Sequence, residues 1–305
     1  MSLDLPYIDL QLNGCHGVDF NADGLSAAAC HAACEELRAD GVRHVLATII
    51  SDDLDRMAAR LAKIATIRRQ DPLAASVIRG IHVEGPFLNP EPGYAGAHPA
   101  ESIRPADLDA MKRLIDAAAG LVCIVTLAPE HDPGLNVTRW LAAQKIIVSA
   151  GHCNPSLDQL RAAIDAGLSM FTHLGNGCPM FLHRHDNIIQ RALSLADELW
   201  ICFIGDGVHI PYHALANYLR CVPPDRAIIV SDAISAAGLG PGRYTLGPQT
   251  VEVGEDLVAR SPDGSHFIGA AATMPQIAAG LREKAGLDEA TIRRLMLTNP
   301  SHVIG

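Results

Sequence analysis

Short, continuously hydrophobic runs alternate along this chain with longer segments in which apolar residues recur at helical spacing. The runs predict strands at residues 7–13, 42–50, 77–83, 121–127, 145–150, 169–172, 200–204 and 227–230. The segments between and after them predict helices at residues 26–40, 51–69, 105–119, 135–143, 155–166, 211–220, 274–284 and 289–297. Ser51 and Asp52 are the N-cap candidates of the second helix. Strands without polar alternation are typical of a parallel sheet that helices cover on both faces.

An unbroken alternation of eight strands with helices is the pattern of a closed (β/α)8 barrel. We therefore expect one α/β domain over residues 1–305, a TIM-type barrel, with residues 244–261 forming a small hairpin outside it. A doubly wound open sheet is the alternative. No G-x-G-x-x-G sequence opens a helix after the first strand, which weakens the dinucleotide-binding version of that fold.

Composition narrows the class of partner. The 305 residues are 49% hydrophobic, which suffices for a large core, and the formal net charge is -10. An acidic surface argues against a nucleic-acid or membrane-surface partner, and no apolar run reaches the ~20 residues that span a bilayer. The eight cysteines form no C-x-x-C pair, and the N-terminus lacks a signal-like hydrophobic core. We expect a cytoplasmic protein with reduced thiols and a small-molecule partner.

Polar residues stand where the predicted strands end. His152 and His173 follow two neighbouring strands, and Glu84 follows an earlier one. Because the carboxyl ends of parallel strands meet at one mouth of a barrel, these side chains can converge there. Two histidines and a carboxylate suit Zn²⁺ or Fe²⁺ with one position open for water, whose pKa would fall from ~15.7 toward ~7. The rival interpretation is that each residue only caps a strand or binds a loop amide.

Further groups at the same end suggest a reaction. Asp232 ends the last strand and is the candidate general base, able to take a proton from water and pass it to a leaving amine. Two turn-rich loops, 87–102 and 175–186, follow the strands that end near Glu84 and His173. Arg184 in the second loop is the best candidate for binding an anionic group. The residues alone thus indicate metal-assisted hydrolysis of a polar C–N or C–O bond.

The same residues occur within motifs of a known family. The motifs are IDLQLNGC at 8–15, HVEGPF at 82–87, GAH at 96–98, SAGH at 149–152, THLGN at 172–176, DGVH at 206–209, SDA at 231–233, GAAATM at 269–274 and TNP at 298–300. Their order and combination resemble the N-acetylglucosamine-6-phosphate deacetylase family of the amidohydrolase superfamily. The resemblance covers nearly the whole chain.

The resemblance implies a role for each matched residue. Glu84, His152 and His173 would be the metal ligands, Asp232 the general acid/base, and His98 the residue that faces the amide carbonyl. The implied substrate-binding residues are Ala97, Asn176, Gly177, Arg184, His209, Phe267, Ile268 and Gly269, with Arg184 and His209 at the phosphate. In the family the phosphate-binding arginine can come from the second subunit of a dimer, so we expect a homodimer.

One bound metal ion is expected rather than two. Many amidohydrolases end their first strand in His-x-His, whereas Gln11 and Asn13 stand at those positions here. Amide side chains are weak ligands for a transition metal, so we expect a single divalent ion, zinc, with iron as the alternative.

The expected reaction is deacetylation of N-acetylglucosamine 6-phosphate to glucosamine 6-phosphate and acetate. The alternatives are hydrolysis of another N-acyl amino sugar or of a cyclic amide, and a barrel that binds without catalysing. The complete Glu/His/His/Asp set favours an enzyme over the binding module. Three departures from the family bear on this expectation. The flanking β-sandwich is expected to be largely or wholly missing, Gly175, Gly177 and Cys178 replace the family's more usual residues, and the segment after Arg184 is not the common one.

Overall fold

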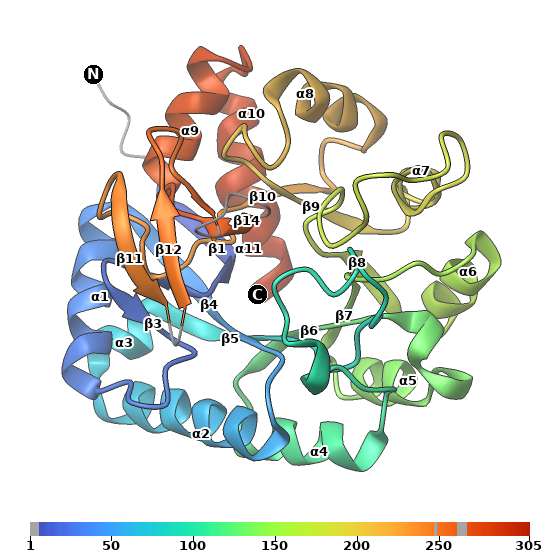
Figure 1. The fold of residues 1–305 in the computed structure, drawn as a ribbon, viewed down its shortest axis with the longest axis horizontal. Helices are drawn as coiled ribbons and strands as arrows, with labels where there is room; N and C mark the ends of the chain where they lie inside the picture. The colour runs from blue at the N-terminus through green and yellow to red at the C-terminus, as the bar shows by residue number, and fades with distance from the viewer. Residues whose placement is uncertain (1–5, 247–248, 261–266) are drawn as a thin grey trace.

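Eight parallel strands form the centre of the protein (Figure 1). The computed structural model describes residues 6–246, 249–260 and 267–305. The strands lie in chain order around the sheet and are β1 (Tyr7–Leu12), β4 (Val42–Ile50), β5 (Ile78–Glu84), β6 (Val122–Leu127), β7 (Ile147–Ala150), β8 (Leu168–Phe171), β9 (Trp200–Ile204) and β10 (Ala227–Val230). The short strands β2 (Gly14–Cys15) and β3 (Val18–Asp19) pair with each other just beyond β1.

Backbone hydrogen bonds close the sheet between its first and last strands. The amide of Asp232 donates to the carbonyl of Gln11 at 3.0 Å, and the amide of Asn13 donates to the carbonyl of Ala233 at 2.8 Å. The buried carboxylate of Asp9 accepts the hydroxyl and amide hydrogens of Ser231 at the same seam. The predicted (β/α)8 barrel is therefore confirmed, and the open doubly wound alternative is wrong.

Helices surround the barrel on the outside (Figure 1). They are α1 (Ala27–Ala39), α2 (Leu54–Gln70), α3 (Pro72–Val77), α4 (Leu108–Ala117), α5 (Asn136–Ala143), α6 (Leu157–Asp165), α7 (Ile188–Leu193), α8 (Tyr212–Cys221), α9 (Met274–Glu283), α10 (Glu289–Arg293) and α11 (Asn299–Ile304), with a π turn at Arg294–Thr298. Short 3-10 turns, η1 to η3, lie at Ala100–Ser102, Pro129–His131 and Pro133–Leu135. Within the described residues, no helix combines the length and the apolar character that crossing a bilayer requires.

The predicted cap of α2 is wrong. The carboxylate of Asp53 accepts the amides of Asp55 and Arg56, so Asp53 is the N-cap rather than Ser51 or Asp52. Ser51 is instead fully buried at the mouth of the barrel. The short helices α3 and α7 were not predicted, because six residues are too few to establish a helical period.

Two hydrophobic cores hold the barrel together. Side chains from alternate positions of the strands fill its interior, and Val303 and Ile304 of α11 pack against that cluster. A larger core lies between the outer faces of the strands and the surrounding helices. The interior is thus packed with side chains, as in other barrels of this type, which leaves the mouth at the carboxyl ends of the strands as the place for chemistry.

A separate antiparallel sheet stands at one edge of the barrel mouth. It contains β11 (Gly242–Leu246), β12 (Gln249–Val253), β13 (Val258–Arg260) and β14 (Phe267–Ala270), drawn in orange in Figure 1. The predicted hairpin at 244–261 is therefore part of a four-stranded sheet, and its residues 247, 248 and 261 lie outside the described residues. An isolated bridge between Ala233 and Ala270 joins this sheet to the end of β10.

Candidate active site

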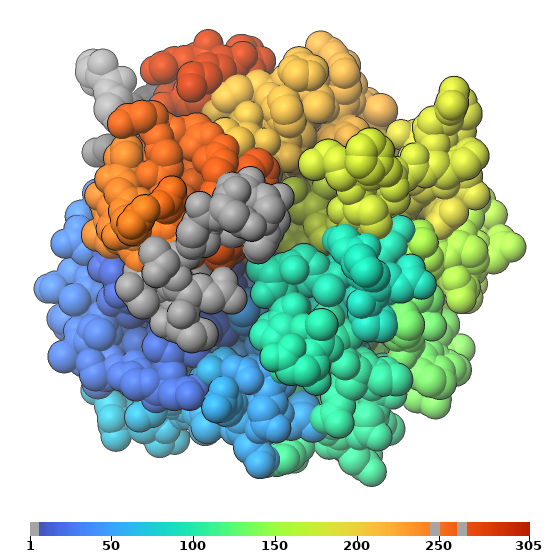
Figure 2. Space-filling model, viewed as in Figure 1, coloured from blue at the N-terminus to red at the C-terminus, as the bar shows by residue number. Residues whose placement is uncertain are grey.

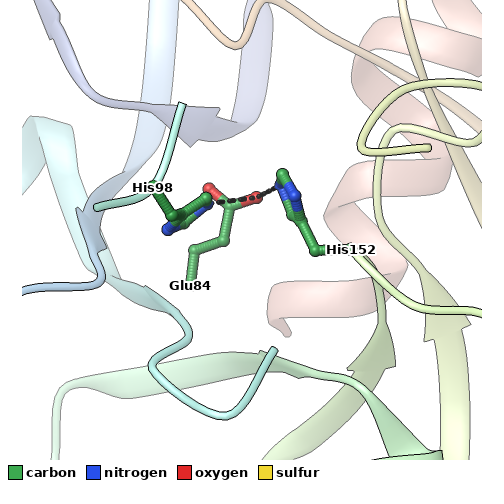
Figure 3. A group of neighbouring side chains, drawn as sticks. All are labelled: Glu84, His98 and His152. Atoms are coloured by element: carbon green, nitrogen blue, oxygen red, sulfur yellow. Dashed lines mark ion pairs between the residues drawn. The ribbon is translucent and has the colours of Figure 1, made fainter. Parts of the chain in front are cut away.

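Four polar side chains from separate segments meet at the carboxyl end of the barrel. The Glu84 Oε1 atom lies 2.9 Å from His173 Nε2, 3.3 Å from His152 Nε2 and 4.0 Å from His98 Nε2. The two nearer nitrogens, those of His152 and His173, are 3.1 Å apart. Figure 3 shows the His98 and His152 imidazoles on either side of the Glu84 carboxylate. All four side chains are buried.

A common backbone geometry aims three of the predicted residues into the mouth. His152, His173 and Asp232 each lie two residues after a strand ends, at φ angles of 51°, 31° and 50°. Non-glycine residues rarely adopt positive φ, and such strain concentrates at functional sites. The turn that follows each strand thus directs its polar side chain back over the barrel.

Contacts on both faces hold the His152 imidazole in one orientation. Its Nδ1 lies 2.7 Å from the carbonyl oxygen of Tyr94, which can only accept, so Nδ1 carries the hydrogen and Nε2 keeps a free lone pair. Gly96 and Gly177 both have positive φ, and a Cβ on either would come within 2.8 Å of the ring. Each glycine therefore provides space that the imidazole fills.

The opposite tautomer follows for His98. The backbone amide of Ser51 donates to His98 Nδ1 at 3.3 Å, and the Ser51 hydroxyl lies 2.9 Å from the same atom. An Nδ1 that accepts leaves the hydrogen on Nε2, which points toward Glu84. Burial lowers the pKa of His98 to about 3, which keeps this imidazole neutral. His98 is therefore arranged to donate a hydrogen bond into the site, whereas His152 is arranged to donate a lone pair.

Glu84 remains ionised inside this cluster. Burial acts to raise the pKa of the carboxyl group, but the adjacent imidazoles of His152 and His173 outweigh burial and bring this pKa well below its ordinary value. The amide of Gln11 donates to both Glu84 oxygens, at 3.2 and 3.1 Å. For His173, burial lowers the pKa, but the hydrogen bond that His173 donates to Glu84 and the negative charge of Glu84 turn the net shift upward.

The arrangement of Glu84, His152 and His173 fits a tetrahedral metal ion. Ligands about 2.0–2.1 Å from such an ion lie about 3.3 Å from one another, close to the three separations of 2.9, 3.1 and 3.3 Å between the Glu84 oxygen and the two imidazole nitrogens. Lone pairs on two imidazole nitrogens repel at 3.1 Å unless a proton or a cation lies between them. Glu84, His98 and His152 also form a group whose possible ligand atoms all lie within 4.8 Å of one another. The donor set suits zinc or iron.

Asp232 follows β10 and contacts Asn13, which follows β1. The Asn13 Nδ2 group donates to Asp232 Oδ1 at 2.9 Å, while the Oδ1 atom of Asn13 is buried without a partner among the described residues. Burial and the nearby charge of Glu84 raise the pKa of Asp232 above its ordinary value. A carboxylate with a raised pKa is suited to accept and return a proton.

The predicted substrate-binding residues divide into two groups. Near the cluster, Gly177 packs on His152, and the backbone amide of Asn176 donates to the His173 carbonyl at 2.9 Å. On the β14 side, the rings of Phe267 and His209 are 5.0 Å apart, and a Cβ at Gly269 would lie 3.7 Å from the Asp232 carbonyl. Three predicted residues remain. Ile268 lies in β14 and is partly buried, whereas Ala97 and Arg184 lie in the two loops and are exposed.

The two loops lie side by side at the mouth. Figure 2 shows the 87–102 loop in teal beside the 175–187 loop in yellow-green. Gly93 in the first loop packs on Pro179 in the second, since a Cβ there would be 2.7 Å from the Pro179 Cα. Arg184 makes no hydrogen bond or ion pair with the rest of the described chain, and its neighbours Met180 and Phe181 are 92% and 94% exposed. The single chain therefore does not join Arg184 to the four-residue cluster.

Comparison with known proteins identifies the family. The chain is 30% identical to an N-acetylgalactosamine-6-phosphate deacetylase of Escherichia coli O157:H7, over 98% of this chain and 77% of the relative. It is 32% identical to an N-acetylglucosamine-6-phosphate deacetylase of Bacillus subtilis, over 98% of this chain and 74% of the relative. The chain belongs to the N-acetylglucosamine-6-phosphate deacetylase family of amidohydrolases. No family model matches the chain.

A solved structure supports the same membership in this deacetylase family. The N-acetyl-D-glucosamine-6-phosphate deacetylase of Mycobacterium smegmatis, studied with N-acetyl-D-glucosamine-6-phosphate, superposes with a TM-score of 0.88 at 29% identity, covering 98% of this chain and 77% of that one. These relatives are hydrolases, so the predicted enzyme class is confirmed. The predicted roles of individual residues stay predictions.

Several residues that shape the site were not predicted as functional. Ser51 and Tyr94 set the tautomers of His98 and His152, and Gln11 holds Glu84, although it was considered only as a weak ligand. Tyr94 acts through its backbone carbonyl, which leaves no signature in the sequence. The one available signal was the density of glycine and proline in the 87–102 loop, which indicates a functional loop but not which of its atoms is used.

Proposed function

We propose that this protein removes the acetyl group from N-acetylglucosamine 6-phosphate, releasing glucosamine 6-phosphate and acetate. Membership in the deacetylase family supports the reaction, and the site geometry supports its chemistry. The observation that carries the proposal is the triangle of Glu84, His152 and His173 atoms, with separations of 2.9 to 3.3 Å, at the mouth of the barrel. Residues 1–305 would act as one catalytic domain.

One divalent metal ion, which we propose to be zinc, would be held by Glu84, His152 and His173. An ion bound there supplies Lewis acidity for attack of water on the acetamide carbonyl. Gln11 and Asn13 stand where many amidohydrolases carry the histidines that bind a second metal, and Gln11 instead donates to Glu84. Both observations support a single ion. Iron remains the alternative because the same ligands serve both metals.

The protein's own groups would supply the proton transfers and orient the substrate. His98 would donate its Nε2 hydrogen to the carbonyl oxygen, since its Nδ1 is engaged by Ser51. Asp232 would accept the proton of the attacking water and return it to the nitrogen of the departing amine. Asn13, which donates to one oxygen of Asp232, leaves the other oxygen for this transfer.

The phosphate would be bound by His209 and Arg184, and the protein would act as a cytoplasmic homodimer. His209 Nδ1 lies 2.6 Å from Asp206, which orients its ring and turns Nε2 away from that carboxylate. Arg184 is exposed in a loop with two exposed apolar neighbours, which supports a contribution from this loop to the site of a second subunit. Ala97, Asn176, Gly177 and the Phe267–Gly269 segment would line the sugar.

Acetate release, measured together with metal content, tests the proposal. The purified protein should release acetate from N-acetylglucosamine 6-phosphate, lose this activity when a chelator removes its metal, and regain it when Zn²⁺ is restored. The 4-epimer, N-acetylgalactosamine 6-phosphate, and the sugar without phosphate should be assayed in parallel, because a relative carries the name of the former. Absence of both metal and acetate release on every substrate would instead favour a non-catalytic barrel.

A further inference from the structure

A half-buried carboxylate near the proposed metal site has no part in the chemistry described above. Glu130 follows β6, in the 3-10 turn Pro129–His131. Its Oε1 atom accepts the side-chain amide of Asn89 at 3.0 Å and also the backbone amide of Asn154. Its Oε2 atom is buried without a partner among the described residues. A carboxylate is costly to bury, and burial raises the pKa of Glu130, so apolar packing does not account for it.

Both donors to Glu130 are connected to His152. The backbone amide of Asn89 donates to the carbonyl of His152 at 2.9 Å, and Asn154 lies two residues after His152. The 87–102 loop, which contains Asn89, also supplies the Tyr94 carbonyl that accepts from His152 Nδ1. Glu130 therefore links the segment on one side of the His152 turn to the loop that holds its ring.

The linkage continues to the loop after β8. The Asn154 side-chain oxygen accepts the Arg191 guanidinium at 3.1 Å, and Arg191 pairs with Asp186 at 2.6 Å. The 175–187 loop that ends there also contains Gly177, which packs on the other face of the His152 ring. The Tyr94 carbonyl and Gly177, which contact this imidazole, thus belong to segments that Glu130 joins directly or through Asn154.

The His152 turn is the element that needs such support. Its φ of 51° is unfavourable for a residue with a Cβ, and strained conformations persist only where the surrounding structure over-determines them. Groups that do not touch a metal but hydrogen-bond to its ligands hold those ligands in the orientation that binds. The loss of such a group typically weakens metal affinity about 10–100-fold.

We propose that Glu130 is a positioning residue that fixes the His152 imidazole for metal binding by tying together the Asn89 and Asn154 segments. This inference rests on the metal site of the proposed function. Its ligand is the same divalent ion, and Glu130 itself would not touch that ion or the substrate.

Two variants separate a positioning role from a general effect on folding. Glu130→Gln keeps an oxygen where Oε1 accepts both donors, whereas Glu130→Ala removes both hydrogen bonds. Glu101→Gln, in an exposed turn of the neighbouring loop, is the control. Zinc affinity is measured by competition with a chromophoric chelator, and the visible absorption spectrum of the Co²⁺-substituted protein reports the geometry of its ligands. The melting temperature of each metal-free protein is recorded alongside.

We expect zinc affinity to fall about 10–100-fold in Glu130→Ala, with a changed Co²⁺ spectrum, and to be largely restored in Glu130→Gln. Unchanged affinity and spectrum in Glu130→Ala would overturn the inference, as would an equal loss in Glu101→Gln. If Glu130→Ala does not fold, Asn89→Leu is tested in its place, because it removes the hydrogen bond from the Asn89 side chain to Glu130. This variant must then show the weakened zinc affinity. A native protein that binds neither Zn²⁺ nor Co²⁺ would instead refute the proposed metal site itself.

Discussion

At the scale of single residues, hydrogen-bond partners rather than residue type distinguish the histidines of the site. His98 and His152 lie with ring centroids 4.5 Å apart, yet one accepts a backbone amide at Nδ1 and the other donates to a backbone carbonyl. The same residue type is thereby prepared for two tasks, donation of a hydrogen and donation of a lone pair. The partner of Nδ1 decides what Nε2 can do.

Asp232→Asn should lower kcat about 10²–10⁴-fold, because the amide cannot accept the proton of the attacking water. The variant retains the size of the side chain and an oxygen for the Asn13 hydrogen bond, so zinc content should remain that of the unmodified protein. Steady-state kinetics with N-acetylglucosamine 6-phosphate and elemental analysis check both points. Near-normal turnover with the metal in place would refute the role of Asp232 as the base.

At the scale of elements, three strands end in the same way and place three side chains at one mouth. The positive φ values of His152, His173 and Asp232 show that strand order alone does not aim these groups, and the residues after the strands complete the placement. Glycines in the loops make room for the result, since both Gly96 and Gly177 contact the His152 ring.

Gly177→Ala should weaken zinc binding and lower stability. The added methyl group would lie 2.8 Å from His152 Nδ1, on a backbone with a φ of 60°, so the imidazole or the loop must move. We expect a loss of about 1–3 kcal/mol in the free energy of unfolding. Chemical denaturation and a zinc competition assay measure the two effects.

Gly24→Ala is the matched control for this substitution. A Cβ at Gly24 would meet no atom within 4 Å, and no positive φ is recorded there. Its stability should therefore change by less than about 1 kcal/mol, with zinc affinity retained. Equal effects in the two variants would show that contact with His152 is unimportant.

At the scale of the whole molecule, the seam between β1 and β10 makes the stability of the barrel depend on pH. Burial raises the pKa of Asp9 to about 6, against an ordinary value of 3.8, despite its hydrogen bonds from Ser231. Because the folded protein then holds this proton more tightly than the unfolded chain, Asp9 favours folding most below pH 3.8.

The contribution of Asp9 to the free energy of unfolding should fall by about 3 kcal/mol as the pH rises from 3.8 to about 6. Above that pH it should stay constant. Asp9→Asn removes the titrating group, so the difference in unfolding free energy between the native protein and the variant should depend on pH in this interval. Urea denaturation at several pH values measures that difference. A difference that does not vary with pH would contradict the raised pKa.

A homodimer with shared sites predicts complementation between two inactive variants. Arg184→Ala should lose most activity on the phosphorylated sugar, and Asp232→Asn should lose turnover. In a mixed dimer, the subunit with intact Asp232 would receive Arg184 from its partner, so random mixing should restore about a quarter of the sites. Subunits are exchanged by mild denaturation and refolding, and each variant refolded alone is the control. No recovery despite exchange would place Arg184 outside the partner's site.

The family, the reaction class and the barrel were all predictable from sequence, whereas the working of the site was not. Continuous apolar strands alternating with helical segments have few arrangements that bury them, and a barrel places every strand end at one mouth. Glu84, His152 and His173 could therefore be grouped before their distances were known. The cap of α2 was misassigned because Ser51, Asp52 and Asp53 are all good capping residues by type.

The sequence by itself determined the order of the strands and which polar side chains stand at their ends, because periodicity and position are properties of the chain. Only the tertiary structure decided which histidine nitrogen carries a hydrogen, how Gln11 and Glu130 brace the ligands, and that Arg184 stands apart from the cluster in a single chain. Those features depend on backbone carbonyls, amides and glycine surfaces brought together from distant segments. The backbone groups among them recur in nearly every residue, so the sequence does not reveal which of them will meet.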